Sequence, residues 1–150
     1  MARSSRRIGA ALAVAAGVFT ADQLVKWVVR ANAHRLPYRI LPWARVELAY
    51  NSGISFSRFA DAGWIVTALV GAVAAAVAAA LFLAPPRYRI PLGVILGGAL
   101  GNLVDRFRFS GAVADYLAVW KWPPFNVADA AILIGTVLLV IQVLRATREQ

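Results

Sequence analysis

Apolar residues dominate four stretches of the chain, and most polar residues lie between them. The stretches are Ile8–Val29, Trp64–Leu83, Ile90–Val104 and Val127–Leu144. A helix needs about 20 mostly apolar residues to cross the hydrocarbon of a bilayer, so the third stretch must continue to about position 108. The pattern predicts one all-α membrane domain over residues 1-150, with transmembrane helices at about 8-29, 64-83, 90-108 and 127-144.

Two long polar loops, Arg30–Gly63 and Arg106–Phe125, separate these spans. In the first loop "RVELAYN" alternates apolar and polar residues, which favours a half-buried strand. In the second, "GAVADYLAV" is either a short strand or a re-entrant segment. We therefore expect a small β-element beside the four helices. Four tryptophans fall near the predicted span ends, where amphipathic rings prefer the membrane interface: Trp43, Trp64, Trp120 and Trp122.

Composition and charge support the membrane interpretation. The chain is 61% hydrophobic and only 15% charged, which excludes an ordinary soluble domain. Its net charge of +9 could indicate nucleic-acid binding, but the basic residues cluster at the ends of the apolar stretches, where lipid headgroups lie. We expect membrane lipids and no nucleic acid as partners.

The distribution of basic residues predicts the orientation. Four crossings place both termini on one side and both long loops on the other. The termini and the Pro85–Pro86 turn hold seven basic residues, whereas the loops hold eight over more than twice the length, with acids among them. Positive charge concentrates in cytoplasmic segments, so we expect cytoplasmic termini and extracytoplasmic loops. The first span carries Asp22 and Lys26 and is too long for a signal-peptide core, so we expect it to be retained.

Residue types limit the chemistry. The chain has no cysteine, which excludes a disulfide and a thiolate nucleophile, and its one histidine, His34, argues against a His-based metal site. We expect no metal and no cofactor. Gly93, Gly97 and Gly101 recur every four residues and predict a small-residue face for close helix packing.

Four acids are predicted to meet at one face of the membrane. Asp105 ends the third span, Asp129 begins the fourth and Asp115 lies in the loop between them. Asp22 lies about 10 Å below the same surface at 1.5 Å of rise per residue. Intramembrane acids are candidates for a functional site, so their convergence locates the site.

Each acid also has a structural interpretation. Asp22 and Lys26 have the i,i+4 spacing of a helical ion pair, and Asp105 could pair with Arg106. Asn126 and Asp129 have the spacing of a helix cap. Asp115 has no basic neighbour in sequence and is the hardest to explain structurally.

Two carboxylates can activate water without a metal when they share one proton. One then stays ionised and accepts a proton from water, while the other stays protonated and polarises a carbonyl. Peptide hydrolysis at a membrane surface fits this chemistry. The residues alone leave the pair open among Asp105, Asp115 and Asp129.

Five motifs appear in one order along nearly the whole chain: "ADQLVKW", "NSGISF", "GGALGNLVDRF", "VADYL" and "FNVADAAI". Together they resemble bacterial lipoprotein signal peptidase, signal peptidase II. The resemblance implies an aspartic endopeptidase of the inner membrane that removes the signal peptide from diacylglyceryl-modified prolipoproteins, cutting before the lipidated Cys. It implies a site at the extracytoplasmic face, and we expect the protein to be a monomer.

The resemblance also assigns roles to residues. It implies that Asp115 and Asp129 are the catalytic dyad, and it gives supporting or substrate-binding roles to Asn51, Gly53, Asn102, Asp105, Arg106, Asn126, Asp22 and Lys26. The implied fold is a four-helix bundle with a β-element from the first loop and a short helix in the second. Ser55 departs from the family pattern, which usually has Ala there.

Two other functions remain as alternatives. A small proton-coupled transporter should hold some acids near the bilayer midplane, whereas here they gather at one face. A non-enzymatic membrane scaffold subunit gives Asp115 no role.

Overall fold

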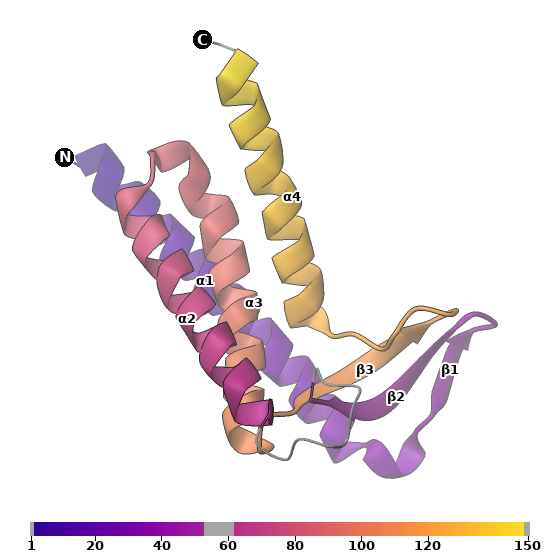
Figure 1. Cartoon of the computed structure of the whole chain (residues 1–150). Coiled ribbons are helices and arrows are strands. Elements are labelled where there is room, and N and C mark those ends of the chain that lie inside the picture. Colours follow the sequence, from indigo (N-terminus) through magenta and orange to yellow (C-terminus); the bar gives the residue numbers. More distant parts are fainter. Residues whose placement is uncertain (1, 53–61, 149–150) are drawn as a thin grey trace.

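The computed structural model describes residues 2–52 and 62–148. Four long helices and one antiparallel sheet make up this part of the chain (Figure 1). The elements, in chain order, are α1 Ala2–Ala31, the 3-10 turn η1 Ala33–Arg35, β1 Tyr38–Leu41, β2 Ala44–Asn51, α2 Ala62–Leu83, η2 Pro86–Tyr88, α3 Arg89–Arg108, β3 Val113–Val119 and α4 Val127–Arg148.

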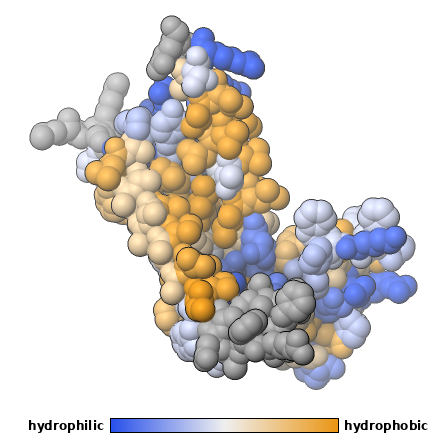
Figure 2. All heavy atoms as spheres, in the orientation of Figure 1, coloured by the Kyte–Doolittle hydropathy of each residue, from blue (hydrophilic) through white to orange (hydrophobic). Residues whose placement is uncertain are grey.

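The four helices are long and apolar enough to cross a membrane, at Ser5–Ala31, Gly63–Leu83, Pro86–Arg108 and Val127–Arg148. This confirms the four predicted spans, each extended by a few residues. Figure 2 shows hydrophobic surface along the helices, and hydrophilic residues at the chain ends and over the sheet. Both termini lie at one end of the bundle and the sheet lies at the other (Figure 1).

Helix α3 is the most buried of the four and packs against each of the others. Its glycines explain this, as predicted from their spacing. A Cβ on Gly97 would lie 2.5 Å from the Ala15 carbonyl oxygen of α1, and one on Gly98 would lie 2.5 Å from that of Ala128 in α4. Glycine on these faces lets neighbouring backbones approach closely, as in other small-residue helix contacts.

The sheet has the order β1-β2-β3. The strand predicted at "RVELAYN" is β2, and β3 shows that "GAVADYLAV" is a strand rather than a re-entrant segment. The short helix expected in the second loop is wrong, because that segment pairs with β2 through Tyr50 opposite Ala114 and Val46 opposite Leu117. Both long loops therefore contribute to one sheet.

Helix packing at Gly97 gives a stability prediction. Gly97→Ala should lower the free energy of unfolding in detergent by about 1–3 kcal/mol, and with it the melting temperature, because the added methyl group overpacks the α1–α3 contact. Gly17→Ala is the matched control, since a Cβ at Gly17 meets nothing within 4 Å. Equal melting temperatures for the two variants would contradict the close α1–α3 contact.

Candidate active site

The site is built where three spans meet the sheet. Asp22 comes from α1, Asn102 and Asp105 from α3, Asp115 from β3, and Asp129 from the first turn of α4. The structure therefore brings together residues that lie as much as 107 positions apart in the chain (22 to 129). The acids meet at the sheet end of the bundle, as the sequence predicts.

A buried ion cluster forms the base of the site. The Nζ atom of Lys26 lies 2.9 Å from Asp22 Oδ2 and 3.0 Å from Asp105 Oδ2, and all three side chains are 0% exposed. Buried charges are stable only when they are paired and hydrogen-bonded. One ammonium group therefore serves two carboxylates, from two different helices.

The same two carboxylates bind the backbone beside the other two acids. Asp22 Oδ1 accepts a hydrogen bond of 2.9 Å from the backbone N–H of Ala128, which precedes Asp129. Asp105 Oδ2 accepts one of 3.1 Å from the N–H of Ala114, which precedes Asp115. Asp22 and Asp105 thus fix the start of α4 and the start of β3.

The orientation of the Asn102 amide follows from Lys26. Asn102 Oδ1 accepts hydrogen bonds from Lys26 Nζ at 3.0 Å and from Asn126 Nδ2 at 3.2 Å. Its Nδ2 group therefore points the other way and donates to Asp129 Oδ1 at 2.8 Å. Lys26 therefore determines that Asn102 presents its Nδ2 group, and not its Oδ1 atom, to Asp129.

Asn126 bridges Asp115 and Asp129. Its Nδ2 group donates to Asp115 Oδ1 at 2.7 Å, while its Oδ1 accepts from the Asp129 N–H at 2.9 Å. Its own N–H donates to Asp129 Oδ2 at 3.1 Å, which completes the predicted capping box of α4. Asn51 Nδ2 donates to the second oxygen of Asp115 at 3.2 Å. Asp129 therefore caps the helix and also faces Asn102.

The two bridged acids have no cation of their own in ion-pair contact among the described residues. Burial raises the pKa of Asp115 to about 6, and the negative charge of Asp129 adds to the increase. Hydrogen bonds from Asn51 and Asn126, and the charge of Lys26, lower the pKa in part. Asp115 therefore keeps its proton to a higher pH than an ordinary aspartic acid does.

Tyr116 joins β3 to the start of α4. Its Oη accepts a hydrogen bond of 3.2 Å from the backbone N–H of Val127, the first residue of α4. Burial raises the pKa of Tyr116 to about 12, so the phenol stays neutral. Its position supports the strand-to-helix contact rather than proton transfer.

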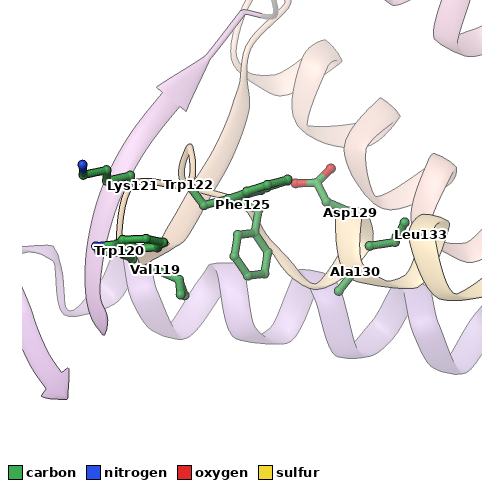
Figure 3. Close-up of a pocket in the computed structure, with 8 residues that line it drawn as sticks. All are labelled: Val119, Trp120, Lys121, Trp122, Phe125, Asp129, Ala130 and Leu133. Atoms are coloured by element: carbon green, nitrogen blue, oxygen red, sulfur yellow. The ribbon is translucent and has the colours of Figure 1, made fainter. Parts of the chain in front are cut away.

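Asp129 lies at the edge of an apolar cavity. The cavity has a volume of about 550 Å³. Figure 3 shows Asp129, Ala130 and Leu133 on α4 facing the turn after β3, with Trp122 and Phe125 between them. A second apolar cavity of about 250 Å³ lies between α2, α3 and α4 and reaches Asn102 and Arg106. The polar network thus lies between two apolar clefts.

Arg106 does not pair with Asp105, and the local pair considered from the sequence is wrong. Arg106 Nη1 donates instead to the carbonyls of Gly111 at 2.6 Å and Ser52 at 3.4 Å. It therefore ties the turn after α3 to the end of β2. Gly53, which the resemblance includes in the site, lies outside the described residues.

Gln23 belongs to the network but was missed from the sequence. Its Nε2 group donates to the Gly101 carbonyl at 3.1 Å and lies 3.2 Å from Asp22 Oδ2 and 3.4 Å from Asp105 Oδ1. Its Oε1 accepts from Arg108 at 3.0 Å. Its position next to Asp22 was the only sign of this role in the sequence. That sign is weak, because adjacent residues on a helix point in different directions.

The sequence matches a known protein family. The sequence model described as "Signal peptidase (SPase) II" matches residues 14–145. The chain belongs to the signal peptidase II family. It is therefore a member of a peptidase family and a multi-pass membrane protein. Membership in this family removes the support for the transporter and scaffold alternatives.

Relatives in distant bacteria share this similarity. The lipoprotein signal peptidase of Paraburkholderia phytofirmans is 41% identical over 149 residues, covering 91% of this chain and 86% of the relative. That of Moorella thermoacetica is 37% identical over 140 residues, covering 89% and 91%. That of Rhodococcus jostii is 40% identical over 139 residues, covering 87% and 70%.

Solved structures share the fold. A bacterial membrane enzyme determined by the in meso method at 2.3 Å resolution matches with a TM-score of 0.76 and 22% identity, over 95% of this chain and 92% of that chain. One determined at 1.9 Å resolution matches with a TM-score of 0.76 and 21% identity, over 91% and 93%. The bundle and sheet of the family are thus found in known membrane enzymes.

The ion cluster gives a stability prediction. Lys26→Met should lower the free energy of unfolding by about 3–5 kcal/mol, because it leaves the carboxylate of Asp22 buried without a cation and that of Asp105 with only Arg30 at 4.0 Å. Thermal unfolding in detergent measures the change. Arg45→Met is the matched control, since it breaks the exposed pair with Glu47 and should change stability little. Equal effects of the two substitutions would contradict a central role for Lys26.

Proposed function

We propose that this chain is an aspartic endopeptidase that removes the signal peptide from diacylglyceryl-modified prolipoproteins. The cut falls directly before the lipidated Cys. Two kinds of observation support the proposal: the names of the relatives, and the bridging of the two acids by Asn126, which donates its side-chain Nδ2–H to Asp115 and its backbone N–H to Asp129. This bridge is the decisive observation, because it holds the carboxylates of Asp115 and Asp129 beside each other. Neither carboxylate forms an ion pair with Lys26.

The proposed dyad shares one proton. Asp115 carries it, because burial and the charge of Asp129 raise its pKa. Asp129 is the base: it accepts a proton from water as the water oxygen attacks the scissile carbonyl carbon, and Asp115 donates a proton to the carbonyl oxygen. As the resulting diol collapses and the C–N bond breaks, Asp129 gives its proton to the peptide nitrogen and Asp115 takes one from a diol hydroxyl, which restores the starting state of the dyad. The remaining residues of the network position these two acids.

The clefts beside the dyad suit an apolar substrate that lies in the membrane. Asp129 lines the cavity with Trp122, Phe125 and Leu133, and Asn102 reaches the cavity between α2, α3 and α4. The signal-peptide helix and the acyl chains of the substrate are both apolar, so burial in these clefts gives binding energy. Holding them against the bundle orients the peptide bond toward the acids. The enzyme acts as a monomer and needs no cofactor.

We place the protein in the bacterial inner membrane with both termini in the cytoplasm. The sheet and the dyad then lie at the extracytoplasmic face. Support comes from the distribution of basic residues and from the position of both termini at the bundle end opposite the sheet (Figure 1). The scissile bond of a membrane-anchored signal peptide lies at this level.

Orientation can be tested by labelling single cysteines, since the natural chain has none. Ser110→Cys lies in the exposed turn at the sheet end, and Arg87→Cys lies in the exposed turn at the opposite end. In intact cells a membrane-impermeant maleimide should label Cys at position 110 and leave position 87 unlabelled. The reverse pattern would invert the proposed topology.

The dyad is tested by Asp115→Asn and Asp129→Asn. Each should reduce turnover by at least roughly a hundredfold while the protein stays folded, because general acid–base catalysis is lost. The double variant should be little worse than either single one, since residues that act as a unit are non-additive. Cleavage of a diacylated prolipoprotein and thermal unfolding are both measured.

Asp105→Asn is the control for this assignment. If Asp105 only supports the site, the variant keeps measurable activity, or loses activity together with thermal stability because its bond to Lys26 is weakened. A folded Asp105→Asn enzyme as inactive as Asp115→Asn would place Asp105 in the dyad. A folded Asp115→Asn or Asp129→Asn enzyme with near-normal turnover would end the dyad proposal.

The pH profile tests the proton on Asp115. Because the pKa of Asp115 is about 6, the shared proton is held below this pH and lost as the pH rises through it. The value of kcat/KM should therefore fall above about pH 6, with apparent pKa values that belong to the pair. Asn51→Ala removes a hydrogen bond that lowers this pKa, so the alkaline limb should move to higher pH.

Asn32→Ala is the matched control, because Asn32 donates to the Val28 carbonyl at an exposed site. Its pH profile should equal that of the unmodified chain. An alkaline limb that stays in place or moves to lower pH in Asn51→Ala would show that Asp115 does not carry the essential proton.

A further inference from the structure

The far end of the sheet is rich in exposed aromatic and basic side chains. We call this region the sheet tip and define it as residues Arg39–Arg45 with Trp120–Trp122. Trp43, Trp120 and Trp122 are 55%, 77% and 71% exposed. The sheet extends sideways from the bundle at the end where α4 begins (Figure 1). Trp120 and Trp122 also line the cavity beside Asp129, at the start of α4.

Two arginines face each other in the sheet tip. The register of β1 and β2 pairs Arg39 directly with Arg45, so both side chains lie on one face of the sheet. Like charges directly opposite each other destabilise a sheet. Arg45 Nε lies 2.6 Å from Glu47 Oε2, but within residues 2–52 and 62–148 no carboxylate forms an ion pair with Arg39. The pair leaves an uncompensated positive charge.

The arginines line a small cavity in the sheet tip. It has a volume of about 150 Å³, and its remaining lining residues are Leu41, Pro42, Trp43, Ala44 and Trp120. The Trp120 N–H donates to the Trp43 carbonyl at 2.6 Å, which joins the two turns around the cavity. Lys121 Nζ lies 5.7 Å from the centre of the Trp120 ring. The cavity is therefore lined by two positively charged side chains and an aromatic wall.

We propose that this pocket binds the headgroup phosphate of an anionic phospholipid and so docks the sheet tip on the bilayer surface. Guanidinium groups match phosphate oxygens in geometry and charge. Exposed tryptophans are enriched at membrane interfaces, and basic residues near a membrane attract anionic lipids. The chain crosses the membrane, so its sheet tip is always within reach of lipid headgroups. The bound phosphate neutralises the arginine pair.

The arginine pair is distinct from the dyad, and its proposed role does not depend on the peptidase activity. Trp120 lines both this cavity and the cavity beside Asp129, but Arg39 and Arg45 line only the former and take no part in the polar network around Asp115 and Asp129. Lipid binding by the sheet tip can therefore be measured in a protein that cleaves nothing, and its failure would leave the peptidase proposal intact.

The test is a titration of the full chain, purified in a neutral detergent, with soluble short-chain lipids. Dihexanoylphosphatidylglycerol should bind saturably, and more tightly than dihexanoylphosphatidylcholine or inorganic phosphate. Arg39→Gln and Arg45→Gln should each weaken this binding roughly fivefold, the effect of one basic residue near an anionic surface. Arg39→Lys, which keeps the charge but loses the planar donor pair, should also bind more weakly.

Arg87→Gln is the matched control, because Arg87 is also exposed, lies 5.0 Å from the ring of Tyr88, and is in the turn at the opposite end of the bundle. It should bind phosphatidylglycerol like the unmodified chain. Arg39→Gln should melt no lower than the unmodified chain in detergent, because it removes a repulsive charge. Binding of inorganic phosphate as tight as that of phosphatidylglycerol would make this a free-anion site instead. Equal binding of the two lipids, or unchanged binding in both arginine variants, would overturn the proposal.

Discussion

The buried ammonium group of Lys26 is the interaction on which the site depends. It pairs with Asp22 of its own helix and with Asp105 of α3, and it also donates to Asn102. Through these three contacts one charge joins two helices and sets the orientation of an amide. The cost of leaving any of these groups buried without a partner is several kcal/mol, so α1 and α3 are held in one register.

The Lys26 ion cluster divides the four acids into two kinds. Asp22 and Asp105 share the Lys26 ammonium group, and they also accept hydrogen bonds from Gln23 and from the backbone N–H groups that precede Asp129 and Asp115. Asp115 and Asp129 receive amide donors instead, and burial raises the pKa of Asp115. The fold thus keeps two carboxylates fixed but incompletely neutralised, which is the condition that shared-proton chemistry requires.

Much of this arrangement was predictable from the sequence, because hydropathy sets the spans and the spans place the acids at one end. The i,i+4 pair of Asp22 and Lys26 and the cap formed by Asn126 and Asp129 are local, so their spacing alone predicted them. Contacts between elements were not predictable in this way. The pairing of Lys26 with Asp105 needs the α1–α3 packing, and adjacent helical residues such as Asp105 and Arg106 point apart. The sheet joins both loops because its register depends on tertiary structure.

The account is tested most directly by one cleavage reaction. The purified chain is incubated with a prolipoprotein in two forms, with and without diacylglycerol on its lipobox Cys, and the released signal peptide is analysed by mass spectrometry. The proposed function predicts one fragment that ends at the residue before the lipidated Cys, with little or no product from the unmodified form. No fragment, a cut at another bond, or equal rates for the two forms would contradict it.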